Sequence, residues 1–222
     1  MGIKDNLNKL LEKLPENVTL VAVTKTRSES EVMEAFNAGH RIFGENRVQE
    51  LFDKKENLPE DIQWHMVGHL QSNKVKYIAP FVSLIHGVDS LKLLKVINKE
   101  GRKNNRVIDC LLQIHIAEEE TKFGMSEEEV VNVFHSPAVK DLENVRICGL
   151  MGMATFTDNR KQVRKEFSRL AGLFGKLKDK FSGEFPSFSE LSMGMSSDYD
   201  IAMEEGSTMI RVGTEIFGER NR

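Results

Sequence analysis

The sequence predicts one (β/α)8 TIM barrel, of the α/β class, with an extra helix at its amino terminus. Two observations support this prediction. Apolar segments rich in Val, Ile and Leu alternate with helix-like segments, giving eight units in about 200 residues. No linker rich in Pro, Gly or Ser divides the chain, so we expect a single domain over residues 1–222. Strands separated by helices pair in parallel, and eight such units at this length favour a closed barrel over an open sheet.

The amino-terminal segments already show the alternation. Residues 2–14 carry apolar side chains at helical spacing, which predicts the extra helix. Residues 19–26 predict a first strand that is buried on both faces, as parallel strands are. Ser28 stands three residues before Glu31, a capping-box pattern that begins the next helix. The pattern then continues with a strand at 40–46, a helix at 48–55 and a strand at 62–68.

The second half repeats the same unit. A strand at 81–88 is followed by Asp89 and Ser90, which cap a helix, and the longest apolar run, 107–116, is the fifth strand. The remaining predicted elements are a helix at 127–134, a strand at 145–153, a helix at 161–181, a strand at 187–193, a short helix at 199–205 and a strand at 209–217.

Composition narrows the possible partners and compartments. A net charge of -3 gives no general attraction to nucleic acid or to an anionic membrane, so small-molecule partners are expected. The first residues lack the apolar centre of a signal peptide, and no run reaches the roughly 18 apolar residues of a membrane span. We therefore expect a cytoplasmic protein. Cys110 and Cys148 lie in apolar strand-like runs, which predicts reduced core residues.

The first strand delivers one lysine at its carboxyl end. Residues 19–26 read TLVAVTKT, so Lys25 emerges where the strand meets a loop. In a barrel of parallel strands, this rim holds the active site. A lysine partly removed from water has its charged form disfavoured, and its free amine can attack an aldehyde such as pyridoxal phosphate or a sugar aldehyde. The alternative is an ordinary surface lysine just after a strand.

Other strand ends bring polar and small residues to the same rim. Ser196, with the backbone N–H groups of Gly213 and Thr214, forms a plausible cradle for a phosphate near the last two strands. Alternatively, Gly194 and Gly213 merely serve turns or tight packing. The other residues expected at this rim are Asn46, residues 65–69, Met153, residues 192–196 and residues 211–214.

The histidines give no sign of a metal centre. Four of them are spread without ligand spacing. His65 and His69 are four residues apart, but they follow a strand and not one face of a helix. We therefore predict no metal site.

Five separated sequence blocks span nearly the whole chain. They are VTKT at 23–26; FGEN with VQE at 43–50; WH with Gly68 and LQSNK at 64–74; LSMGMSSD at 191–198; and RVGT with IFG at 211–218. Together these blocks resemble one known family, the pyridoxal phosphate homeostasis proteins. The resemblance implies the barrel of the alanine racemase amino-terminal domain, and pyridoxal 5'-phosphate bound as a Schiff base. It also implies a part in vitamin B6 homeostasis and amino-acid balance, without an established turnover.

The resemblance also implies the cofactor site. Lys25 becomes the Schiff-base lysine, Arg211 lies at the pyridine nitrogen and Asn46 lies beside the ring. The residues implied at or near the phosphate are Ser192, Ser196, Gly213 and Thr214, and the spacing does not separate the roles of the two serines.

Arginine at the ring nitrogen limits the chemistry. A guanidinium donates a hydrogen bond without giving up its proton, so the ring stays a poor electron sink and transamination is disfavoured. Racemases of this fold need a second base, a tyrosine from a carboxyl-terminal domain of the partner subunit, and we expect Tyr77 and Tyr199 to be packing or surface residues. We therefore expect a monomeric carrier or buffer, with apo-enzymes as possible recipients. A slow amino-acid racemase and a Schiff-base aldolase of phosphosugars remain the alternatives.

Overall fold

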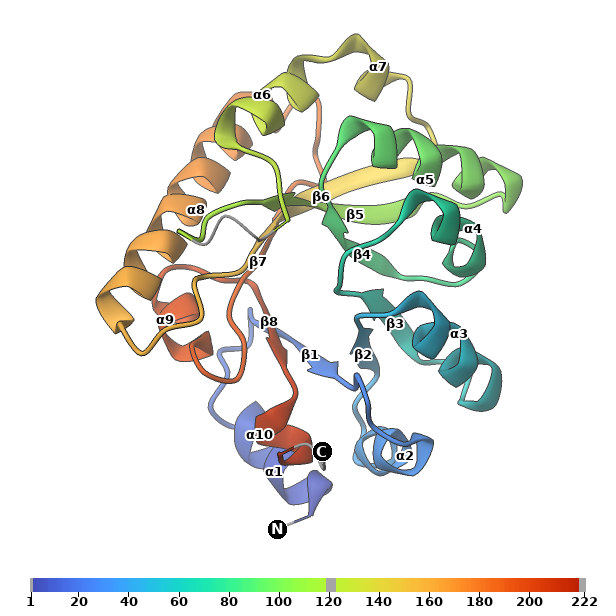
Figure 1. The fold of residues 1–222 in the computed structure, drawn as a ribbon, viewed down its shortest axis with the longest axis vertical. Helices are drawn as coiled ribbons and strands as arrows, with labels where there is room; N and C mark the ends of the chain where they lie inside the picture. Colours follow the sequence, from blue (N-terminus) through green and yellow to red (C-terminus); the bar gives the residue numbers. More distant parts are fainter. Residues whose placement is uncertain (1, 119–122, 220–222) are drawn as a thin grey trace.

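The computed structural model describes residues 2–118 and 123–219 and contains a closed barrel of eight strands. The strands follow each other around the barrel in chain order, and every neighbouring pair is parallel. Figure 1 shows the helices outside the ring of strands. The predicted (β/α)8 barrel is confirmed.

The strands are short, as expected for inner strands that only need to span the barrel. Their bounds are β1 Thr19–Val23, β2 Ile42–Glu45, β3 Gln63–Met66, β4 Leu84–Val88, β5 Ile108–Ile114, β6 Val145–Gly152, β7 Glu190–Ser192 and β8 Met209–Val212.

The helices vary more in length. Their bounds are α1 Ile3–Leu11, α2 Glu29–Asn37, α3 Val48–Asn57, η1 Ser72–Lys74, α4 Val75–Ile78, α5 Leu91–Lys103, α6 Glu127–His135, α7 Pro137–Lys140, α8 Arg160–Phe181, α9 Tyr199–Glu204 and α10 Thr214–Phe217. The capping box predicted at Ser28 is present, since its hydroxyl accepts from the N–H of Glu31 and the Glu31 carboxylate accepts from the N–H of Ser28. None of the helices in the described part of the chain is both long and apolar enough to cross a membrane.

Period-two alternation along the strands divides the apolar residues between two cores. One core fills the space between the strands and the surrounding helices, where Leu20, Phe43 and Trp64 pack. The other fills the barrel and is small, because the closed ring leaves little room. Its buried members are Val21, Leu84, Leu111, Cys148, Met151 and Met209. The remaining inward positions are therefore free to be polar, and they form the site described below.

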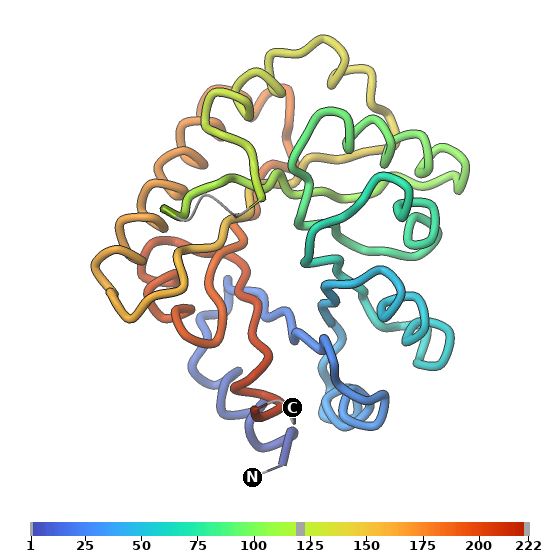
Figure 2. The backbone as a smooth tube through the Cα atoms, viewed as in Figure 1, coloured from blue at the N-terminus to red at the C-terminus, as the bar shows by residue number. Residues whose placement is uncertain are grey.

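The predicted strand at 209–217 was wrong in its second half. The strand ends at Val212, and Gly213, with φ -123° and ψ -65°, leads into the short helix α10. The side-chain amide of Asn6 in α1 donates to the carbonyl oxygen of Ile216 at 3.1 Å. Ile216 and Phe217 are buried, as strand residues would be, and a four-residue helix is too short to show a helical period. Figure 2 shows α1 and α10, the first and last elements, side by side.

One glycine lies where two strands approach too closely for any side chain. A Cβ atom added at Gly149 in β6 would lie 1.7 Å from the backbone oxygen of Glu190 in β7. We expect Gly149→Ala to lower the free energy of unfolding by at least about 2 kcal/mol, because the strands must separate. Urea unfolding at neutral pH measures this effect.

Gly172 is the matched control for this prediction. It lies in the interior of α8, and a Cβ there would meet nothing within 4 Å. Gly172→Ala should be neutral or stabilise the protein by up to about 1 kcal/mol, through helix propensity alone. Equal effects of the two substitutions would contradict the close approach of β6 and β7.

Candidate functional site

A cavity of about 600 Å³ lies at the carboxyl ends of the strands. The fold brings together six of the seven residues predicted for the site, and all six line this cavity. They are Lys25, Asn46, Ser196, Arg211, Gly213 and Thr214. The seventh, Ser192, is fully buried and is not among the lining residues.

Strand alternation explains why Lys25 faces the cavity. Val21 belongs to the inner core, and Val23 lines the cavity two residues later. Lys25 is the next inward position, two residues after the end of β1, and it also lines the cavity. The next residue, Thr26, has a φ of 63°, in the left-handed region that few non-glycine residues adopt. The chain therefore turns sharply away from the barrel immediately after presenting the lysine.

Arg211 is the buried cation of the site. It pairs with Val21 across β1 and β8, so it also points inward, and it is 4% exposed. Its Nη1 donates to the hydroxyl of Ser192 at 2.7 Å, and its Nη2 donates to the carbonyl oxygen of Gly152 at 3.1 Å. Burial lowers the pKa of Arg211 to about 10, against a smaller opposite effect of Asp198. At neutral pH the guanidinium stays protonated and remains a hydrogen-bond donor.

Ser192 lies behind Arg211, at the start of a buried polar chain. Its hydroxyl is 3.1 Å from Nδ1 of His86, and Nε2 of His86 is 3.1 Å from Nδ1 of His65. Arginine can only donate, so Ser192 accepts from Arg211 and has its own proton for His86. The hydrogen bonds are then all satisfied if each histidine carries its proton on Nε2. The chain thus crosses the barrel interior from the cavity toward its opposite end, where His65 lines a second pocket.

Close packing explains both glycines near the predicted phosphate cradle, Gly194 and Gly213. A Cβ at Gly213 would lie 2.9 Å from the carbonyl oxygen of Val23, and the N–H of Gly213 donates to the hydroxyl of Ser196 at 3.2 Å. Gly194 has a φ of 94°, and a Cβ there would lie 2.6 Å from that of Ala202. Both glycines are therefore required for tight packing, which was the alternative explanation for them. This packing does not compete with phosphate binding at Gly213, because that glycine also lines the cavity.

Aromatic residues at the rim complete the cavity. His69 stacks on Phe123, with ring centroids 4.0 Å apart, and its Nδ1 lies 3.2 Å from the carboxylate of Asp89. Phe123 and Phe156 line the cavity but are 54% and 84% exposed. His69 was among the residues expected at the rim, whereas Phe123 and Phe156 were not predicted. Among the described residues, no tyrosine lines the cavity, and the hydroxyl of Tyr199 donates to Glu215 at 3.1 Å.

Residues 2–118 and 123–219 hold no group of three or more His, Cys, Asp or Glu side chains arranged for a metal ion. The cysteines expected in the core, Cys110 and Cys148, are buried and free. Burial raises the pKa of both thiols, that of Cys148 to about 11, so neither is a thiolate at neutral pH.

Comparison with known proteins places the chain in a family. A family model described as the alanine racemase N-terminal domain matches residues 2–221. A pyridoxal phosphate homeostasis protein from Aquifex aeolicus is 38% identical over 231 residues, which cover 99% of each chain. The chain belongs to the pyridoxal phosphate homeostasis protein family. A protein of the same name from Escherichia coli K12 is 36% identical, over 93% of this chain and 88% of its own. The resemblance drawn from the sequence blocks is confirmed.

Solved structures share the barrel closely. PipY of Synechococcus elongatus PCC7942 without PLP has a TM-score of 0.89 at 35% identity, covering 97% of this chain and 100% of that one. The structure of PipY with PLP bound has a TM-score of 0.87 at 34% identity and the same coverage. An alanine racemase of Clostridium difficile 630 has a TM-score of 0.79 at 15% identity and shares the barrel fold.

The buried polar chain of this family member was not found by sequence reasoning. Metal-ligand spacing does not connect these histidines, because they are far apart in the sequence. Strand alternation was the available signal, because His65 and His86 occupy inward positions of β3 and β4. No pairwise spacing rule connects them with Ser192 in β7.

We predict that His65 and His86 stay neutral in the folded protein well below pH 6. Burial lowers the pKa of His65 to about 3 and holds that of His86 well below its usual value. The unfolded chain takes up these protons below about pH 6.5, so stability is lost as the pH falls toward the folded pKa values. The free energy of unfolding should fall by up to about 1.4 kcal/mol per pH unit for each histidine.

Two measurements check this prediction. Imidazole NMR signals of His65 and His86 should remain those of neutral Nε2–H rings down to pH 5, and urea unfolding should show stability falling between pH 6.5 and 5. A titration midpoint above pH 5 for either ring would refute the prediction that both rings stay neutral, and a neutral Nδ1–H tautomer of either ring would refute the direction given to the hydrogen bonds.

Proposed function

We propose that this protein binds pyridoxal 5'-phosphate as a Schiff base on Lys25 and acts as a carrier or buffer in vitamin B6 homeostasis, with an indirect effect on amino-acid balance. One observation carries the proposal. Lys25 and Arg211 face one cavity, in a chain 34% identical to PipY, whose structure is described with PLP bound. The relatives named pyridoxal phosphate homeostasis protein support the same function.

The chemistry of the lining residues fits this cofactor. Pyridoxal 5'-phosphate supplies an aldehyde, a ring nitrogen and a phosphate dianion. Lys25 offers an amine for the aldehyde, and the buried guanidinium of Arg211 offers a donor for the ring nitrogen. At the phosphate end, Ser196 offers a hydroxyl and Thr214 offers a hydroxyl and a backbone N–H, while the N–H of Gly213 donates to Ser196, and Asn46 borders the same space. Contact between Ser192 and the cofactor stays a prediction, and its bond to Arg211 supports an indirect role.

The residues that line the cavity favour binding of the cofactor over catalysis with it. Arg211 keeps its proton at neutral pH, so it orients the ring nitrogen without protonating it. No tyrosine among the described lining residues is available as the second base of a racemase. The exposed Phe123 and Phe156 leave apolar surface at the rim, where a recipient has access to the cofactor. Transfer to apo-enzymes, a cytoplasmic location and a monomeric state belong to this proposal.

Lys25→Ala should abolish the covalent linkage. The purified wild-type protein, supplied with pyridoxal 5'-phosphate, should show the visible absorption of an imine, and borohydride should fix the cofactor to the peptide containing Lys25. Lys55→Ala is the control, because Lys55 lies on α3 with its ammonium 3.4 Å from Glu56, and it does not line the cavity. An unchanged imine band in Lys25→Ala would refute the assignment of Lys25.

We also predict no racemisation by the loaded protein. Exchange of the Cα proton with inversion requires acids or bases on both faces of the substrate. Incubation of alanine or serine with the loaded protein in deuterium oxide should therefore leave the amino acid unlabelled at Cα, as judged by NMR. Incorporation above that of free pyridoxal 5'-phosphate, lost in Lys25→Ala, would favour the racemase alternative.

A further inference from the structure

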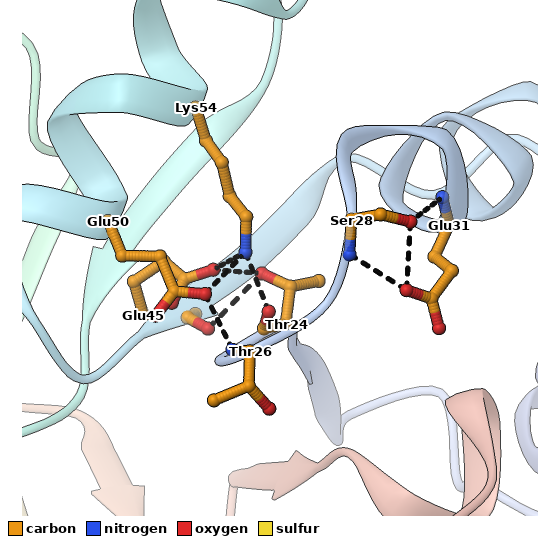
Figure 3. A network of polar contacts seen from close by, with 8 residues as sticks. Thr24, Thr26, Ser28, Glu31, Glu45, Glu50 and Lys54 are labelled. Carbon is orange, nitrogen blue, oxygen red and sulfur yellow. Dashed lines mark hydrogen bonds and ion pairs between the residues drawn. The ribbon is translucent and has the colours of Figure 1, made fainter. Parts of the chain in front are cut away.

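A buried polar network lies on the outer side of the barrel, directly behind the lysine of the cavity. Lys54 in α3 is only 5% exposed, and its ammonium is the centre of the network (Figure 3). Lys54 Nζ donates to the carbonyl oxygen of Thr24 at 2.7 Å, to Glu45 at 2.6 Å and to Glu50 at 2.9 Å. All three N–H donors of the ammonium are therefore used inside the protein.

The network makes hydrogen bonds to the backbone on both sides of Lys25. The carbonyl of Thr24, the residue before Lys25, accepts from Lys54. The N–H of Thr26, the residue after it, donates to Glu50 at 2.5 Å. Glu50 and Lys54 are one helical turn apart, so a single rigid face of α3 holds both contacts. The second contact is made at the residue whose φ is 63°, a conformation that needs support from its surroundings.

The same network also reaches the strand that presents Asn46. The hydroxyl of Thr24 donates to Glu45 at 2.6 Å, and Glu45 is the last residue of β2, immediately before Asn46. The ends of β1 and β2 are thus tied together through side chains as well as by their ladder. This fixes the relative positions of Lys25 and Asn46, both of which line the cavity.

The network is poorly explained as a source of stability. Glu45 is fully buried, burial raises its pKa despite the nearby Lys54, and its Oε2 has no partner among the described residues. Buried ion pairs of this kind are often no more stabilising than apolar residues of similar size. The contacts they make are nevertheless directional, and here they end on the backbone beside the cavity lysine.

We infer that Lys54, Glu45 and Glu50 are positioning residues that hold the Lys25 amine in place for attack on an aldehyde. The inference rests on the proposed function. In that step Nζ of Lys25, as the neutral amine, bonds to the aldehyde carbon, both amine protons are transferred through solvent to the carbonyl oxygen, and that oxygen leaves as one water. Lys54 cannot replace Lys25, since its ammonium points away from the cavity into the three acceptors. The rate of attack depends on how closely the amine is held to its target.

The test compares Lys54→Met with Lys55→Met. Both changes remove one ammonium from neighbouring positions of α3, but the ammonium of Lys55 lies beside Glu56 and over the ring of Phe81, outside the network. Lys54→Met should slow Schiff-base formation with pyridoxal 5'-phosphate at least about tenfold. Affinity for pyridoxine 5'-phosphate, which has no aldehyde, should stay within about threefold of the wild type, because Arg211 and the residues proposed at the phosphate, Ser196, Gly213 and Thr214, lie outside the network. Lys55→Met should match the wild type in both measurements.

Hydrogen exchange of the ligand-free protein gives an independent readout. The peptide covering residues 23–27 should exchange faster in Lys54→Met and Glu50→Ala than in the wild type and in Lys55→Met, since Lys54→Met removes the donor to the Thr24 carbonyl and Glu50→Ala removes the acceptor of the Thr26 N–H. If Lys54→Met does not fold, Lys54→Met/Glu45→Leu replaces the ion pair with apolar residues and carries the same measurements.

The outcomes separate this inference from the proposed function. Unchanged imine formation and unchanged exchange in the Lys54 variant would overturn the positioning role. An equal loss of imine formation and of pyridoxine 5'-phosphate affinity would assign Lys54 a general structural role and also overturn it. If the wild-type protein forms no imine, the proposed function fails, whereas faster exchange at residues 23–27 in Lys54→Met would still show that the network holds this segment.

Discussion

Closure of the eight-stranded sheet is the constraint on which the rest of this structure depends. A closed parallel barrel leaves no free strand edge, and it forces every second residue of each strand into a narrow interior. The apolar part of that interior is small, with Val21, Leu111 and Met209 among its members. Above it, the inward series continues into Lys25, Asn46 and Arg211, so the same alternation that fills the barrel also builds the cavity.

The interior tolerates polar groups because each one is paired with the next. Arg211 donates to Ser192, Ser192 lies against His86, and His86 lies against His65. A buried cation without such partners would carry a large desolvation penalty. Because both histidines are neutral, this row of hydrogen-bonded side chains crosses the barrel with a single charge, that of Arg211 at the cavity end. The guanidinium is thereby held at a fixed place, with no hydrogen bond to a carboxylate among the residues that the structure describes.

The outer network around Lys54 complements this inner chain. One acts from inside the barrel on Arg211, and the other acts from the helix layer on the backbone that carries Lys25. Lys25 and Arg211 are therefore held from opposite sides of the β-sheet. A cofactor that binds through several weak contacts benefits from such preorganisation, because less ordering remains to be done on binding.

The sequence alone determined the barrel and six residues of its cavity, because both follow from local rules: the strand period, helix caps and the exit of side chains at strand ends. It failed at residues 214–217, where a four-residue helix carries too little periodicity to be distinguished from a strand. The partners of each polar residue were decided only by the tertiary structure. Ser192 meets His86 106 positions away, and Lys54 meets Thr24 30 positions away. Such contacts depend on barrel closure and on how α3 packs against β1 and β2, which no local pattern encodes.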